Sequence, residues 1–163
     1  MSYLRIGPHT SVAAGFCKAV EENHSIGANT FQFFTRNPRG GRARELSEKE
    51  IREMKKLIDE YGFSDIMAHA PYTVNPASAK PRIRKSAREL MSKDLQRLEM
   101  LPCSLYNIHP GNHTGIGTQK GIENVASLIN EVYKKEYSTT ILLETMSGKG
   151  TQIGTRFEAL NTL

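Results

Sequence analysis

The sequence predicts an α/β fold in which a parallel sheet is wound with helices. Short apolar runs alternate along the chain with longer amphipathic runs, a pattern typical of parallel strands joined by helices. The centres of the apolar runs lie roughly 25–40 residues apart, a reasonable length for one βα unit. We expect one domain, 1–163, because domains commonly contain roughly 100–200 residues.

Five apolar runs are expected to form the strands, because each is short and rich in β-branched, aromatic or other apolar residues. They are Tyr3–Ile6, Asn29–Phe34, Ser64–Ala68, Ser104–Ile108 and Thr139–Leu143.

Four longer runs between these strands place apolar residues at helical spacing. They are Ser11–His24, Ser47–Tyr61, Ile83–Leu101 and Thr118–Glu136. The second has the clearest limits, because Ser47 and Glu50 can form a capping box and Gly62 is a stop signal.

A fifth helix is expected to begin near Gly154, where Thr155 and Glu158 can form a second capping box. Few residues follow this start. We therefore expect the chain to end inside its fifth βα unit.

The composition is that of a globular protein, with 38% hydrophobic and 24% charged residues, and this excludes disorder. No apolar run approaches the roughly 18 residues of a membrane helix, and the N-terminus lacks the apolar stretch of a secretory signal. Cys17 and Cys103 lie far apart and show no metal or redox spacing. We expect a cytoplasmic protein without a membrane partner.

Basic residues gather in two places along a chain whose net charge is +5. The segment Arg36–Arg44 carries four arginines and no acid, and Lys80–Arg88 carries five cations and no acid. Such clusters attract phosphate groups. The adjacent Gly40 and Gly41 favour a nucleic-acid-binding loop for the first cluster, whereas the second is interpreted as the solvated face of a helix.

Three potential metal ligands follow successive predicted strands: His69, His109 and Glu144. The C-terminal ends of parallel strands lie on one edge of a sheet, where active sites are found. Imidazole nitrogen and carboxylate oxygen are ligands of zinc and manganese. The sequence therefore predicts a divalent metal site at this edge.

Segments that follow the five predicted strands together resemble the endonuclease IV family of abasic-site endonucleases. Their order and their spread over the whole chain are more specific than any one segment. They are Gly7–Ser11 (GPHTS), Phe33–Arg39 (FFTRNPR), His69–Asn75 (HAPYTVN), Asn107–His113 (NIHPGNH) and Leu143–Gly150 (LETMSGKG).

The resemblance implies a (β/α)8 TIM barrel of which this chain holds about the first five βα units. It also implies hydrolysis of the phosphodiester on the 5′ side of abasic sites in duplex DNA, a step of base excision repair, by an enzyme that binds three zinc ions when complete. By matching motifs, His69, His109 and Glu144 would be zinc ligands, and Glu144 would bridge two metals at the catalytic centre.

Further residues take expected roles from the same segments. Arg36, Asn37 and Arg39 would contact DNA from one loop, with Arg39 entering the base stack at the lesion. Tyr72 would contact DNA from a second loop. His9 and His113 are expected to lie beside the metal ligands.

The family's remaining ligands lie on later strands, so fewer than three zinc ions are expected here. The isolated chain is accordingly expected to cleave abasic DNA poorly or not at all, and to self-associate through the open edge of its sheet. Two alternatives stay open: a sugar isomerase or epimerase on the same metal-binding barrel, and a non-catalytic DNA-binding fragment.

Overall fold

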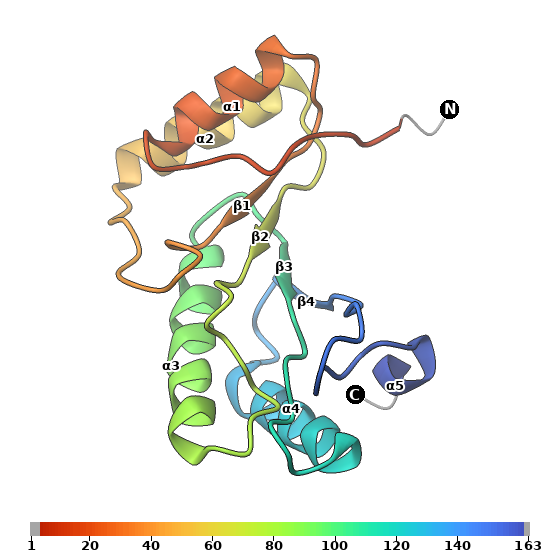
Figure 1. Ribbon diagram of the computed structural model, residues 1–163. Coiled ribbons are helices and arrows are strands. Elements are labelled where there is room, and N and C mark those ends of the chain that lie inside the picture. Colours follow the sequence, from red (N-terminus) through yellow and green to blue (C-terminus); the bar gives the residue numbers. More distant parts are fainter. Residues whose placement is uncertain (1–3, 162–163) are drawn as a thin grey trace.

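The fold is a parallel sheet whose four strands follow the chain order (Figure 1). The computed structural model describes residues 4–161. Its strands are β1 (Gln32–Phe34), β2 (Met67–His69), β3 (Leu105–Ile108) and β4 (Thr140–Leu143), and all neighbouring pairs are parallel. The helices are α1 (Phe16–Ser25), α2 (Glu48–Tyr61), α3 (Pro81–Leu98), α4 (Thr118–Val132) and α5 (Phe157–Asn161). The predicted α/β class is confirmed.

The prediction of a first strand at Tyr3–Ile6 is wrong for the part that is described, since Leu4–Ile6 form no strand; Tyr3 lies outside the described residues. The segment runs beside β1 but forms only one parallel bridge, between His9 and Gln32. Pro8 offers no N–H to a ladder. The side chain of Asn29 replaces further ladder bonds by accepting from Ile6 N at 2.8 Å and donating to the carbonyl of Leu4 at 2.8 Å.

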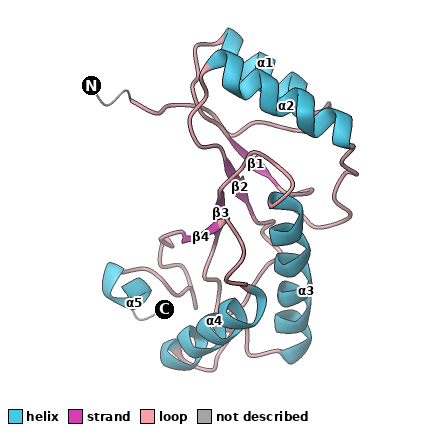
Figure 2. Cartoon of the chain, turned by 180° about the vertical axis from the view of Figure 1, so that it is seen from behind, coloured by secondary structure: helices cyan, strands magenta, loops and turns pink. Residues whose placement is uncertain are grey.

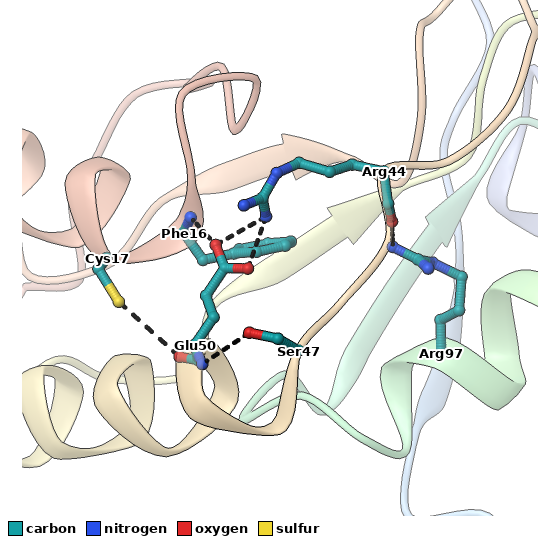
Figure 3. Close-up of polar contacts among 6 residues, drawn as sticks. All are labelled: Phe16, Cys17, Arg44, Ser47, Glu50 and Arg97. Carbon is teal, nitrogen blue, oxygen red and sulfur yellow. Dashed lines mark hydrogen bonds and ion pairs between the residues drawn. The ribbon is translucent and has the colours of Figure 1, made fainter.

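The limits of α2 follow the predicted signals. The Ser47 hydroxyl accepts a hydrogen bond from Glu50 N at 3.2 Å, and Gly62 ends the helix in the left-handed region with φ 66°. The predicted capping box is only half formed, because the Glu50 carboxylate turns to Phe16 N and to Arg44 instead of the Ser47 backbone (Figure 3).

Other helix limits differ from expectation. Helix α1 begins at Phe16 instead of Ser11, because the preceding Gly15 has φ 114°, outside the helical region. Helix α3 begins at Pro81, since proline suits the first helical position. It ends at Leu98, and α4 ends at Val132, both earlier than predicted. Helix α5 covers part of the expected last helix.

Strand alternation separates a helix-facing side of the sheet from an opposite side. Phe33, Ala68 and Tyr106 are paired in register and belong to the buried core formed with α1, α2, α3 and α4. The next register row contains Phe34 and His69 in its first two strands, followed by Asn107 and Leu142. This second row therefore lies on the face away from the core helices.

Seen from behind, the strands form one row, with α3 on one side of it and α5 beyond β4 (Figure 2). Ile141, Leu142 and Leu143 of β4 are only partly buried. Self-association through this edge stays a prediction. No helix between residues 4 and 161 is long and apolar enough to span a bilayer.

Candidate metal centre

The three predicted metal ligands meet at the C-terminal edge of the sheet. His69 is the last residue of β2, while His109 and Glu144 directly follow β3 and β4. Their potential ligand atoms all lie within 4.8 Å of one another. Strand register produces this meeting, because residues up to 75 positions apart in the sequence end neighbouring strands of one sheet.

Glu144 lies at the centre of the cluster. Its Oε2 is 3.0 Å from Nε2 of His69 and its Oε1 is 3.4 Å from Nε2 of His109. Asn107 donates to Oε2 from Nδ2 at 2.5 Å. Burial alone would raise the pKa of Glu144, but its close contact with His69, the nearby His109 and the Asn107 hydrogen bond together hold that pKa below its ordinary value. The carboxylate is therefore ionised at neutral pH.

The hydrogen bonds of His69 constrain its protonation. Its Nδ1 lies 2.6 Å from the carbonyl oxygen of Ala70, and because a carbonyl only accepts, Nδ1 carries the hydrogen. In a neutral ring Nε2 is then a lone-pair acceptor that faces the Glu144 carboxylate. Two acceptors at this distance require either a proton or a cation between them. Orientation of a ligand histidine by a backbone carbonyl is the usual arrangement in metal sites.

The spacing of the cluster fits a transition-metal ion. A tetrahedral zinc ion with bonds of about 2.1 Å holds its ligand atoms roughly 3.4 Å apart. The histidine–glutamate spacings are 3.0 Å to Oε2 and 3.4 Å to Oε1, two different carboxylate oxygens, and a set with one ligand atom from each residue lies within 4.8 Å. Two imidazole nitrogens and one ionised carboxylate form a donor set that zinc accepts, and further positions stay available for water or substrate.

Aromatic rings enclose His69 on the inner side of the site. Its ring centroid lies 5.2 Å from that of Phe34 and 6.2 Å from that of Tyr72. Tyr72 stacks on His109 at 5.9 Å with 26° between the ring planes. His9 lies 6.3 Å from His69, and its Nδ1 is 2.9 Å from Nε2 of Gln32. Burial, and then the charge of His69, lower the pKa of His9.

The arginine-rich loop between β1 and α2 is anchored at both of its ends. At its start, Arg36 pairs with the buried carboxylate of Asp94 on α3. At its end, the Arg44 side chain bonds both carboxylate oxygens of Glu50 at 2.7 Å, and the Arg44 carbonyl accepts from Arg97 at 2.6 Å (Figure 3). The residues between Arg36 and Arg44 are thus attached to α2 and α3 at the two ends of the loop.

The four residues predicted to bind DNA divide into two groups. The Arg36 side chain is 5% exposed and is committed to Asp94. Asn37, Arg39 and Tyr72 are exposed. Tyr72 N donates to the Pro38 carbonyl at 2.9 Å, so the loops that carry Arg39 and Tyr72 lie against each other beside the cluster.

His113, predicted to lie beside the ligands, occupies the loop before α4. Its Nδ1 accepts from the backbone N–H groups of Gly115 and Gly117, both at 3.2 Å. The sequence interpretation missed Asn107, which holds Glu144, and Asp94, which holds Arg36. Asn107 falls in the register row of His69, and strict two-residue alternation within the predicted strand could have identified it.

Comparisons with known proteins identify the family of the chain. The family described as "Xylose isomerase-like TIM barrel" matches residues 20–163. A probable endonuclease 4 of Clostridium beijerinckii is 50% identical over 160 residues, which are 98% of this chain and 58% of that protein. A probable endonuclease 4 of Methanosphaera stadtmanae is 45% identical over 97% of this chain and 57% of its own length. The predicted resemblance to endonuclease IV is confirmed.

Solved structures give the same result. Endonuclease IV from Thermus thermophilus superposes with a TM-score of 0.80 at 27% identity, covering 95% of this chain and 57% of that one. A D-tagatose 3-epimerase-like protein superposes with a TM-score of 0.69 at 22% identity over 96% of this chain and 59% of that one, which shows a shared fold. The chain spans a little under three fifths of the length of these relatives.

Proposed function

The chain belongs to the xylose isomerase-like TIM barrel family, and from this premise we propose that it forms part of the active site of a zinc-dependent endonuclease. The proposed reaction is hydrolysis of the phosphodiester on the 5′ side of an abasic site in duplex DNA. One observation carries the proposal: the His69, His109 and Glu144 cluster lies next to the exposed residues Arg39 and Tyr72 on one edge of the sheet.

The proposed roles within the metal site follow from the contacts. His69, His109 and Glu144 would hold zinc, which when bound supplies a Lewis acid and lowers the pKa of its water toward about 7. Asn107 fixes the Glu144 carboxylate through its 2.5 Å hydrogen bond, and the Ala70 carbonyl directs Nε2 of His69 toward the site. Both contacts orient ligands before substrate arrives.

The proposed DNA contacts lie on the two abutting loops. Asn37 and Arg39 project from a segment anchored at Arg36 and Arg44, and Tyr72 offers an exposed ring beside His109. An arginine and a tyrosine held in this way can replace the missing base's stacking contacts. Selectivity would then depend on the deformability of the lesion more than on base identity.

The sugar isomerase or epimerase alternative has less support. The epimerase-like structure shares the fold at 22% identity, whereas the probable endonuclease 4 sequences reach 50%. A small sugar also requires no arginine loop of this size.

Zinc-dependent selective binding tests the proposal. Fluorescence anisotropy would compare an intact duplex with one that carries a tetrahydrofuran abasic analogue, with zinc and after chelation. We expect at least tenfold preference for the abasic duplex with zinc, and loss of that zinc effect in His109→Ala and Glu144→Gln. Equal binding of both duplexes, or a preference unaffected by zinc and by both substitutions, would contradict it.

A further inference from the structure

A second basic feature lies on the outer surface, between α3 and α4, and the metal centre does not use it. We call it the α3–α4 groove. It encloses about 490 Å³ and is lined by Arg82, Arg84, Lys85 and Arg88 of α3 together with residues of α4 that include Asn124 and Glu131. Four cations thus face a single carboxylate.

The charges of this groove are poorly neutralised. Arg88 pairs with Glu131 at 3.0 Å, and Arg84 donates to the Ser78 carbonyl at 2.6 Å. The side chains of Arg82 and Lys85 are exposed and form no hydrogen bond or ion pair with any residue from 4 to 161. Two exposed cationic side chains therefore line a groove that already carries a net positive charge.

Some exposed cations on the other long helices are neutralised by neighbours on the same helix. Ion pairs between residues three or four apart neutralise Lys18 on α1, Lys49 on α2 and Lys120 on α4. The first turn of α3 contains no acid and carries Arg82 and Arg84. Cations near a helix N-terminus also oppose the helix dipole. The basic start of α3 thus weakens the isolated fold, and an anionic partner would offset this.

The segments that lead into α3 and α4 follow the strand ends that carry the metal centre. The segment from Tyr72 to α3 directly follows β2, and its Ser78 carbonyl accepts from Asn124 of α4 at 3.4 Å. Ala79 N donates to the Thr114 hydroxyl at 2.8 Å, which ties this segment to the loop that follows His109. Helices α3 and α4 lie side by side at the lower end of the molecule in Figure 1.

The lining indicates which anion fits. Pro81 and Leu128 are the apolar residues that line the groove, and neither is one of the aromatic anchors that commonly hold a peptide. Flexible lysine and arginine heads suit the regularly spaced phosphates of a duplex. We propose that the α3–α4 groove binds the phosphate backbone of the duplex that flanks the lesion, a proposal that rests on the function given above.

Salt dependence of DNA binding tests the groove. The double substitution Arg82→Gln/Lys85→Gln removes two charges that have no partner among residues 4–161. The matched control, Lys55→Gln/Lys56→Gln, removes two exposed charges from α2 that likewise have no partner among the described residues. Binding constants for an intact and an abasic duplex would be measured by anisotropy between 50 and 200 mM KCl, which is roughly the range over which phosphate contacts are titrated.

We expect the slope of log K against log salt to fall in magnitude by about 1.8 in the groove variant, since each phosphate contact contributes about 0.9. Affinity should weaken by a similar factor, about threefold to tenfold, for both duplexes, because backbone contacts carry no lesion information. The charge-retaining exchange Arg82→Lys/Lys85→Arg should keep the wild-type slope.

Failure of the groove proposal and failure of the proposed function give different results. A slope unchanged by Arg82→Gln/Lys85→Gln, or lowered equally by the α2 control, overturns the groove while wild-type preference for abasic DNA persists. If the wild-type chain shows no preference for the abasic duplex, the proposed function itself is overturned.

Discussion

Arg36, at the start of the arginine-rich loop, pairs with Asp94 of α3 inside the protein. Their side chains are 5% and 0% exposed. Asp94 also accepts hydrogen bonds from Thr35 Oγ1 at 2.8 Å and from the Tyr106 hydroxyl at 3.0 Å. Burial, and then the charge of Asp94, raise the pKa of Tyr106 well above its ordinary value. One carboxylate thus joins the loop, helix α3 and strand β3.

Replacing Asp94 should be among the most damaging single changes in this chain. Asp94→Ala leaves the Arg36 guanidinium buried without its counter-charge, and breaking a buried pair in this way costs about 3–5 kcal/mol. Urea denaturation would measure the fall in the free energy of unfolding.

A comparison with the exposed pair Lys49–Glu53 serves as control. Glu53→Gln should lower the free energy of unfolding by about 0.5 kcal/mol or less, because solvent screens surface pairs. The double change Arg36→Met/Asp94→Leu should be milder than Asp94→Ala alone, since no charge is then left unpaired. Equal effects of Asp94→Ala and Glu53→Gln would contradict the buried network.

The sequence could not have predicted this pair. Arg36 occupies an arginine-rich, glycine-containing loop, and its local pattern is the same as that of Arg39. Only tertiary packing distinguishes them, because the partner of Arg36 lies 58 positions away on a helix. The limits of α2 could be predicted because neighbouring residues determine them. The Ser47 cap and the Gly62 stop are both found where expected. The first strand failed because Pro8 and the Asn29 side chain interrupt the ladder.

Stability should fall in acid partly through Glu50. Burial alone would raise the pKa of Glu50, but the hydrogen bonds from Arg44 and from Phe16 N hold it below its ordinary value. The ionised carboxylate therefore stabilises the fold fully above the unfolded-state pKa of about 4.3, and this contribution is lost as pH falls through the lower folded-state pKa.

The substitution Glu50→Gln isolates this effect. It should lower the free energy of unfolding by about 1.5–3 kcal/mol at pH 7, the range for hydrogen bonds to charged groups. The difference in that free energy between the variant and the wild type should narrow as pH drops below about 4. Denaturant titrations at a series of pH values would show this. A gap that stays constant, or widens, on acidification would count against the assigned role of Glu50.

Arg39 should matter for DNA and not for folding. Arg39→Ala removes an exposed side chain, so the free energy of unfolding should change by about 0.5 kcal/mol or less. Affinity for an abasic duplex should fall about tenfold, consistent with loss of about 1–3 kcal/mol of stacking and charge contacts. Arg36→Ala should instead act mainly on folding, with a large fall in the free energy of unfolding.

An exposed lysine on α2 provides the control for charge. Lys56→Ala removes the same unit of charge from α2, outside the loop. It should weaken binding only slightly, and by the same factor for the abasic and the intact duplex. If Arg39→Ala behaved like Lys56→Ala, the arginine loop would not be the lesion-reading element.

The grouping of the metal ligands was predictable because it follows from the general geometry of parallel sheets. Parallel strands place their C-terminal ends on one edge, so His69, His109 and Glu144 could be brought together from sequence positions alone. Their exact contacts could not. Strand alternation could place Asn107 on the face of His69, but its hydrogen bond to Glu144 also depends on the register of β3 against β4, which the structure was needed to show.

Metal content tests the central claim most directly. Residues 4–161 contain one cluster of three histidine, cysteine or acidic ligands close enough to share an ion. Mass spectrometry of the metal in purified, zinc-loaded chain should give about one zinc per chain, consistent with one three-ligand site. His109→Ala should weaken the affinity for zinc at least tenfold and so lower the zinc content. His24→Ala removes an exposed histidine stacked on Tyr61 and should leave the zinc content unchanged. No bound zinc, or zinc retained equally by both variants, would contradict the assignment of this edge as a metal centre.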